Sequence, residues 1–268
     1  MLLIHGWTLD LDMWEPQVVE LGGSFRLIRF DRRGFGLSSG SASLAADVRD
    51  ALSLCDKLQL KRFACVGMSQ GARVALHLSR LASDRLSCVV LDGPPRTLAK
   101  EAADKPVGNE RSDVAADDIA DEAEDIPLAE YRSLIARSEI DTFRRSWASH
   151  PLMQLETPSP QSQALLERMT ARYTGKDLLQ ELPSQEPHAL GAHSDHTVTA
   201  HLRTPVLVVT GEHDLPARIR AADALAATLP SSQRASIPAA RHLPNLDAPL
   251  SYNAVLRAFL ERHAGPRY

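Results

Sequence analysis

One short stretch limits what this chain can fold into more than any other. In residues 65–74, the run Gly67-Met68-Ser69-Gln70-Gly71 follows an apolar segment and precedes a helical pattern. Glycines two positions before and two positions after Ser69 leave room for a tight turn that a Cβ atom would block. The spacing predicts a strand, a strained turn and a helix, with the Ser69 side chain lifted clear of the sheet. The plainer alternative is an ordinary strand–turn–helix unit that contains a serine.

The same turn places the Gln70 N–H at the start of the predicted helix. The first N–H groups of a helix have no partner within it, and the helix dipole makes this end positive. Negative charge that develops next to Ser69 would be stabilised there. Ser69 is therefore a candidate nucleophile, and the Gln70 N–H is a candidate donor to an oxyanion.

Around this stretch, apolar strands and amphipathic helices alternate. The first 93 residues read strand, helix, strand, helix, strand, helix, strand, with strands expected at residues 2–4, 26–31, 63–66 and 86–92. The alternation resumes with strands at residues 205–211 and 234–238, and with helices at residues 217–229 and 249–263. Such alternation predicts an α/β fold with a doubly wound, mostly parallel sheet of about six strands.

Residues 94–200 interrupt the alternation and carry no strand pattern. Apolar side chains recur there at helical spacing, for example at Ile140, Phe143 and Trp147. We expect residues 1–93 and 201–268 to form the core and residues 94–200 to form a helical cap. The acidic run 117–125 reads as a solvated segment rather than a metal site. The same holds for the histidines near the end of the insertion, which lack helical spacing and cysteine partners: His188, His193, His196 and His201.

Charge and cysteine content narrow the class of protein. The formal net charge of −4 argues against non-specific nucleic-acid binding. The chain has no apolar run of 18 residues and no signal-peptide pattern, so we expect a cytoplasmic protein without membrane contact. Cys55, Cys65 and Cys88 fall in apolar patterns and read as reduced thiols, with a Cys65–Cys88 disulfide as the less favoured alternative.

Two further residues follow later strands, as Ser69 follows its own. Asp214 comes after the strand at residues 205–211, and His242 comes after the last strand. The carboxyl ends of parallel strands meet at one edge of a sheet, so these three side chains are candidates for a common site. Asp214 could instead cap the next helix, and His242 could be an ordinary loop histidine. Asp92 also ends a strand and is the rival acid, or else a turn residue before Gly93.

Five motifs in order now give a resemblance. They are His5-Gly6-Trp7, Asp31-x-Arg33-Gly34-x-Gly36-x-Ser38, Gly67-x-Ser69-x-Gly71, Gly211-Glu212-His213-Asp214, and His242 followed by Asn245 and Asp247-x-Pro249. Over nearly its whole length the chain resembles the α/β-hydrolase fold superfamily, in particular its esterases, enol-lactonases, carbon–carbon bond hydrolases and perhydrolases with a helical cap.

The resemblance implies a role for each candidate residue. Ser69 would be the nucleophile, His242 the general base, and Asp214 the acid that orients the imidazole. The N–H groups of Trp7 and Gln70 would form the oxyanion hole. No metal and no cofactor would be needed.

The activity expected from this resemblance is hydrolysis of a small-molecule carboxylic ester, thioester or lactone through an acyl-enzyme on Ser69. A carbon–carbon bond hydrolase or a cofactor-free perhydrolase would use the same residues. Epoxide hydrolases and haloalkane dehalogenases need an aspartate at the Ser69 position. An alternative of another class is a ligand-binding receptor or scaffold with a degenerate site. The expected partner is a small-molecule substrate, and the expected assembly is a monomer or homodimer.

The start of the chain departs from this family pattern. Relatives usually carry two more strands before the His-Gly strand, whereas here the chain begins inside that strand. The strand at residues 26–31 should then lie at an edge of the sheet with unpaired backbone groups. We expect either that the natural reading frame extends upstream or that another chain covers this edge.

Overall fold

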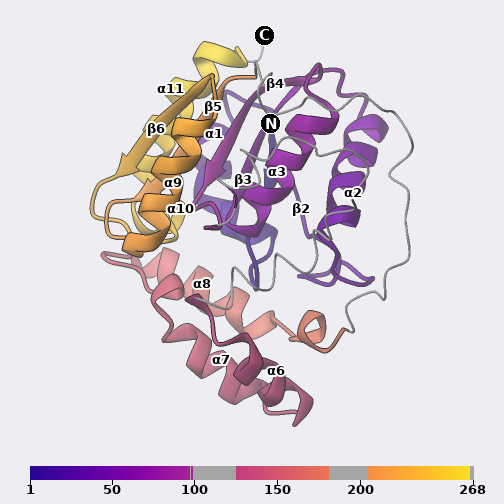
Figure 1. The fold of residues 1–268 in the computed structure, drawn as a ribbon, viewed down its shortest axis with the longest axis vertical. Helices are drawn as coiled ribbons and strands as arrows, with labels where there is room; N and C mark the ends of the chain where they lie inside the picture. The colour runs from indigo at the N-terminus through magenta and orange to yellow at the C-terminus, as the bar shows by residue number, and fades with distance from the viewer. Residues whose placement is uncertain (97, 99–124, 181–203, 266–268) are drawn as a thin grey trace.

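A computed structural model of the protein describes residues 1–96, 98, 125–180 and 204–265 (Figure 1). Its centre is a single six-stranded sheet with the order β2-β1-β3-β4-β5-β6, in which every neighbouring pair is parallel. The strands are β1 (Leu2–Ile4), β2 (Ile28–Phe30), β3 (Phe63–Met68), β4 (Leu86–Asp92), β5 (Val206–Gly211) and β6 (Ser232–Ile237). The predicted parallel sheet is confirmed, and β2 does lie at one edge.

Helices cover both faces of this sheet, because successive strand residues point to opposite sides. One face packs against α2 (Leu44–Lys57), α3 (Gln70–Leu81) and α9 (Pro216–Thr228). The other face packs against η1 (Leu11–Trp14), α1 (Glu15–Leu21) and α11 (Pro249–His263), and the short α10 (Pro244–Asp247) lies beside them. The sheet is therefore doubly wound, as expected.

Local signals explain most of the helix boundaries. The Ser43 hydroxyl accepts the Ala46 N–H at 3.2 Å and caps α2. A proline stands in the first turn of α9 and of α11, where its missing N–H costs nothing. β2 is shorter than the predicted strand at residues 26–31, and the Arg26 carbonyl instead accepts the Met1 amino group at 2.7 Å.

Between β4 and β5, the described residues of the insertion are helical and contain no strand. They form α6 (Leu128–Ala136), α7 (Ile140–Ala148), η2 (Pro151–Met153), α8 (Pro160–Arg172) and η3 (Lys176–Leu179). In Figure 1 these elements lie together at the lower end of the molecule, apart from the sheet. We refer to α6 through η3 as the inserted helices.

The inserted helices pack through an aromatic cluster of four residues. Phe143 and Trp147 of α7 contact Tyr131 of α6 edge-on, with ring centroids 4.9 and 5.9 Å apart. Tyr173, just after α8, lies 5.3 Å from Phe143. All four side chains are buried, as the helical spacing of Phe143 and Trp147 predicts.

Two of the sequence predictions fall largely outside the described residues. These are the four histidines at positions 188, 193, 196 and 201, and most of the acidic run 117–125. Asp125, the last residue of that run, is described and is not solvated. Its carboxylate pairs with Arg218 at 3.1 Å and with Arg96 at 3.4 Å. The expectation of a fully solvated run is therefore wrong at this end.

The cysteines and the lengths of the helices bear on the predicted class of protein. All three cysteines are free and buried, so the less favoured disulfide is not formed. Burial raises the pKa of the Cys55 thiol to about 11, which keeps it protonated at neutral pH. Across the described ranges, every helix falls short of the length and apolarity needed to cross a lipid bilayer.

Candidate active site

Ser69 lies in the strained turn that the glycine spacing predicts. Its backbone has φ 52° and ψ −116°, a left-handed conformation that non-glycine residues seldom adopt. Its N–H donates to the Asp92 carbonyl at 2.8 Å, and its carbonyl accepts the Ala72 N–H at 2.8 Å. The side chain makes no capping bond to α3. The backbone therefore holds the turn while the hydroxyl is not used as a cap.

The two glycines around Ser69 are required by close backbone contacts. A Cβ atom on Gly67 would lie 2.0 Å from the Gly71 carbonyl oxygen, and one on Gly71 would lie 2.3 Å from the Ile4 oxygen. Contacts that short with backbone atoms cannot be relieved by moving a side chain. β3, α3 and β1 approach one another this closely only because both positions lack a side chain.

His242 and Asp214 form a buried pair. Nδ1 of His242 lies 2.9 Å from Oδ2 of Asp214, and the two side chains are 4% and 1% exposed. The second Asp214 oxygen accepts the Leu215 N–H at 2.7 Å. Burial by itself would raise the pKa of Asp214, but the neighbouring His242 ring and its hydrogen bond, helped by Arg218, outweigh burial and hold that pKa below its ordinary value.

This pairing bears on the alternatives for Asp214. Helix α9 begins at Pro216 with Leu215 as its N-cap, and no side chain caps it. The Asp214 carboxylate therefore does not act as a helix cap. With an ionised acceptor on Nδ1, the imidazole carries its proton there and leaves Nε2 free to accept one.

Asp92, the rival acid, lies in a different setting. Its carboxyl group is fully buried at the end of β4, and it makes no hydrogen bond to His242 among the described residues. Burial raises the pKa of Asp92 well above its ordinary value; the Tyr252 hydroxyl opposes this shift, and the Asp214 charge adds to it. This environment therefore favours the neutral form of the carboxyl group. A carboxyl group in this form is poorly suited to stabilise an imidazolium by its charge.

The loop after β1 contains Trp7, the second predicted oxyanion donor. His5 at its start is fully buried, accepts the Arg32 N–H on Nε2 at 2.9 Å, and lies 2.8 Å from the Gly6 oxygen through Nδ1. Burial, reinforced by the Arg32 charge, lowers the pKa of His5 to about 3. His5 is therefore a neutral structural residue rather than a second base.

Arg32 joins the two loops that carry the candidate donors. Its buried guanidinium pairs with Asp47 at 2.7 Å. It also donates to the His5 carbonyl at 3.3 Å and to Gln70 Oε1 at 3.2 Å. Sequence reasoning left Arg32 out, because it is the variable residue of the Asp31-x-Arg33 motif. The only signal in the sequence is that Arg32 stands between two acidic residues, Asp31 at the end of a predicted strand and Asp47 in the following helix.

A small cavity brings several of these groups together. Its volume is about 20 Å³, enough for about one water molecule. Apart from Ser69 and His242, its lining is apolar, with the residues Trp7, Leu9, Met68, Ile126, Trp147, Leu152, Met153 and Leu243. The core and the inserted segment both contribute. Trp7, Ser69 and His242 thus share one cavity, with Asp214 behind His242 and Gln70 beside Ser69.

No candidate metal centre accompanies this cavity. Within the described part of the chain, no three histidine, cysteine or acidic side chains are grouped closely enough to hold a metal ion.

Comparison with known proteins identifies the family of this chain. A family model described as the alpha/beta hydrolase fold matches residues 1–249. The chain is 27% identical over 256 residues to the pimeloyl-[acyl-carrier protein] methyl ester esterase of Nitrosomonas europaea, covering 93% of this chain and 90% of that protein. It is also 38% identical over 119 residues to a Synechocystis sp. protein named "Putative non-heme chloroperoxidase", of which it covers 42%.

A solved structure agrees with these sequence matches. The malate-bound thermophilic esterase from Thermogutta terrifontis superimposes with a TM-score of 0.58 at 27% identity. The alignment covers 98% of this chain and 89% of that one. The alignment therefore spans the inserted segment as well as the sheet.

Proposed function

The chain belongs to the α/β-hydrolase fold family, and on that premise we propose that it is a serine hydrolase of small-molecule carboxylic esters, thioesters or lactones. The observation that carries this proposal is the shared cavity of Ser69 and His242, with Asp214 bonded behind the imidazole. The esterase names of two relatives support the same class of reaction.

The proposed mechanism uses each group for one task. Ser69 Oγ attacks the carbonyl carbon and passes its proton to Nε2 of His242. Asp214 holds the proton on Nδ1 and stabilises the imidazolium. The N–H groups of Trp7 and Gln70 bind the oxyanion of the tetrahedral intermediate. The imidazolium then protonates the leaving group, and a water molecule, activated by His242, hydrolyses the acyl-enzyme.

The lining of the cavity favours an uncharged acyl group. Apart from Ser69 and His242, the described lining is apolar and contains no acidic or basic side chain. A carboxylate or ammonium group would lose its hydration there without gaining a partner. We therefore place esters with an uncharged acyl group ahead of those with a charged one.

A second candidate activity is perhydrolysis, in which hydrogen peroxide replaces water at the acyl-enzyme and releases a peracid. The match to the Synechocystis sp. protein favours it. The acyl-enzyme, and therefore Ser69, is common to both reactions. The two reactions differ in the second step. Release of peracetic acid from an acetyl ester in the presence of hydrogen peroxide would indicate perhydrolysis, and release of acetic acid alone would indicate hydrolysis.

The test is covalent labelling with a fluorophosphonate probe, together with turnover of 4-nitrophenyl acetate. The protein should be labelled and active, and Ser69→Ala should lose the label and about 10⁵-fold or more in kcat, because the triad acts as a unit. Ser149→Ala removes an exposed serine on the inserted helices and should behave as wild type. An unlabelled wild-type protein would instead support the receptor with a degenerate site.

A further inference from the structure

The backbone after Trp7 is strained in a way that the local sequence does not explain. Thr8 has φ 61°, in the left-handed region, and is 2% exposed. A β-branched residue in that conformation is a clear outlier, and such strain persists only where the surroundings hold it. No glycine lies at Thr8 or directly after it. Contacts from elsewhere must therefore hold this loop.

The first of these contacts binds the Trp7 side chain. Nε1 of Trp7 donates to Oδ2 of Asp177 in η3 at 2.7 Å. The other Asp177 oxygen accepts the Tyr173 hydroxyl at 2.6 Å. The Trp7 ring lies edge-on against Trp147 and Tyr173, with centroids 5.0 and 6.1 Å apart. Both the direction and the depth of the Trp7 side chain are thus set by the inserted helices.

The second contact holds Thr8 itself. Nε1 of Trp147 in α7 donates to Oγ1 of Thr8 at 2.7 Å, and both side chains are buried. An indole N–H has no other way to be satisfied at a buried position than through such an acceptor. Thr8 and α7 are therefore joined by a hydrogen bond whose loss would leave a buried donor and a buried acceptor unpaired, which would lower stability.

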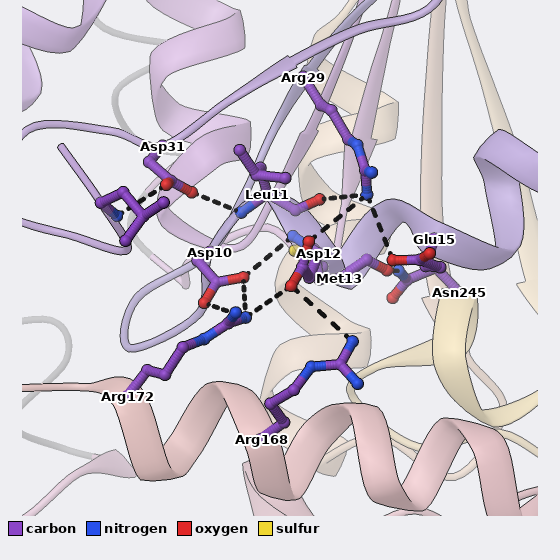
Figure 2. A network of polar contacts seen from close by, with 11 residues as sticks. Asp10, Leu11, Asp12, Met13, Glu15, Arg29, Asp31, Arg168, Arg172 and Asn245 are labelled. Carbon is purple, nitrogen blue, oxygen red and sulfur yellow. Dashed lines mark hydrogen bonds and ion pairs between the residues drawn. The ribbon is translucent and has the colours of Figure 1, made fainter.

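A third set of contacts continues along the same loop (Figure 2). Arg172 of α8 reaches Asp10 and Asp12, in each case with a shortest N–O distance of 2.7 Å. From the core side, Asp31 accepts the Leu11 N–H at 2.8 Å. Figure 2 shows the loop between these partners, with Arg172 reaching up from its helix and Asp31 on the opposite side.

We propose that the inserted helices position the oxyanion hole, with Asp177 as the positioning residue that acts through the Trp7 indole. This inference rests on the proposed function, because it takes the Trp7 N–H as a donor to the oxyanion. The indole, the Trp7 backbone and Thr8 form one short rigid unit. The Trp7 N–H is attached to the Cα that carries the indole and precedes Thr8, so fixing the ring at Asp177 and Thr8 at Trp147 limits the directions which that N–H can take.

The consequence is that the inserted helices do more than cover the site. If they moved away from the core, the two indole bonds would break and the loop would lose the contacts that hold its strain. Turnover then depends on their being seated, whereas substrate affinity depends mainly on the cavity lining. The two quantities, kcat and KM, should separate when the bond between Trp7 and Asp177 is removed, because Asp177 is not part of the cavity lining.

The experiment measures kcat and KM for 4-nitrophenyl acetate in four variants of the full chain. Asp177→Leu removes both acceptors at similar volume, and Trp147→Phe removes the donor to Thr8. Each should lower kcat about 10- to 100-fold, since a misplaced donor costs rate. Asp177→Leu should do so with little change in KM, because Asp177 is not part of the cavity lining, whereas Trp147 is and is compared by kcat alone. Asp177→Asn retains an acceptor oxygen and should recover most of the loss. Asp141→Asn, an exposed carboxylate on α7, is the matched control and should equal wild type.

Two further readouts separate positioning from general damage. Affinity for a trifluoromethyl ketone, which forms a tetrahedral oxyanion on Ser69, should fall by the same factor as kcat. Combining Asp177→Leu with Trp7→Phe should cost no more than the larger single change, because both break the same bond. Additive losses would overturn the inference. The inference would also be overturned if the Asp177→Leu protein showed a cooperative thermal unfolding transition and kept the wild-type kcat.

If Asp177→Leu does not fold, Trp147→Phe decides in its place, and wild-type kcat there overturns the inference. If fluorophosphonate fails to label wild-type Ser69, the proposed function fails. If labelling succeeds while the Asp177 and Trp147 variants keep full kcat, only the inference about the inserted helices fails.

Discussion

Two turns in this molecule hold a non-glycine residue in the left-handed conformation next to the same cavity. Ser69 has φ 52° and Thr8 has φ 61°. At Ser69 the strain is accommodated locally, by Gly67 and Gly71 within two residues of it. At Thr8 the strain is held by Trp147, a residue 139 positions away in the chain.

The difference shows two ways to build one site. The turn at Ser69 depends on missing side chains, so that backbones can approach directly. The loop at Thr8 depends on side chains that are present and that belong to another part of the fold. The first kind of turn survives any change in the inserted helices, whereas the second cannot. Changes in the inserted helices should therefore leave the position of the Ser69 nucleophile unaltered but displace the Trp7 N–H donor.

The largest effect should come from breaking the local turn. Gly67→Ala would place a Cβ 2.0 Å from the Gly71 oxygen, so we expect a loss of at least about 3 kcal/mol in the free energy of unfolding, together with loss of fluorophosphonate labelling. Urea unfolding and labelling measure the two effects. Gly23→Ala is the control, because a Cβ there would meet nothing within 4 Å, and it should change stability by less than about 0.5 kcal/mol. Near-equal stability of the two variants would contradict the comparison.

A smaller effect distinguishes two carboxylates, Asp214 next to His242 and Asp177 next to Trp7, by how each changes the free energy of unfolding with pH. The pKa of Asp214 is lowered in the folded state, so its charge stabilises the fold above the unfolded pKa of about 3.9 and that contribution is lost as the pH falls through the lower folded pKa. Burial raises the pKa of Asp177 in spite of its hydrogen bonds from Tyr173 and Trp7. Its charge therefore costs stability above the folded pKa, and the cost disappears as the pH falls toward about 3.9.

Asp214→Asn and Asp177→Asn should thus show opposite pH trends. Relative to wild type, Asp214→Asn should be less stable at pH 7 than at pH 3, and Asp177→Asn should be relatively more stable at pH 7 than at pH 4. Urea unfolding at pH 7, 5, 4 and 3 gives both curves, with Asp141→Asn as a surface reference. Parallel curves for the two variants would mean that the two carboxylates share one kind of environment.

The smallest effect should come from the exposed part of the loop network. Arg172 is 39% exposed, so Arg172→Met should cost less than about 1 kcal/mol, and less still in high salt. Arg137→Met breaks an exposed ion pair between Arg137 and Glu139, both in the insertion, and should have no measurable effect on stability or kcat. If Arg172→Met lowered kcat as far as Trp147→Phe does, the indole bonds would not be the main support of the loop.

The sequence by itself determined the sheet, the order of its elements and the turn at Ser69. Apolar runs of four to seven residues, helical periodicity and closely spaced glycines are local signals, because each depends on neighbours within one or two turns of the chain. For the same reason the bounds of β4 (Leu86–Asp92) and α11 (Pro249–His263) agree with the prediction to the residue. Ser69, His242 and Asp214 could be named because each follows a recognisable strand.

Only the tertiary structure decided which groups meet. It paired His242 with Asp214 and left the buried Asp92 carboxyl group without a hydrogen bond to the imidazole. It brought Asp177 to Trp7 across 170 positions and placed Arg32 between His5 and Gln70. Such contacts leave no periodicity in the sequence, because a hydrogen bond between distant residues imposes no pattern on the neighbours of either one. The support of the Trp7 loop is therefore a property of the packed molecule.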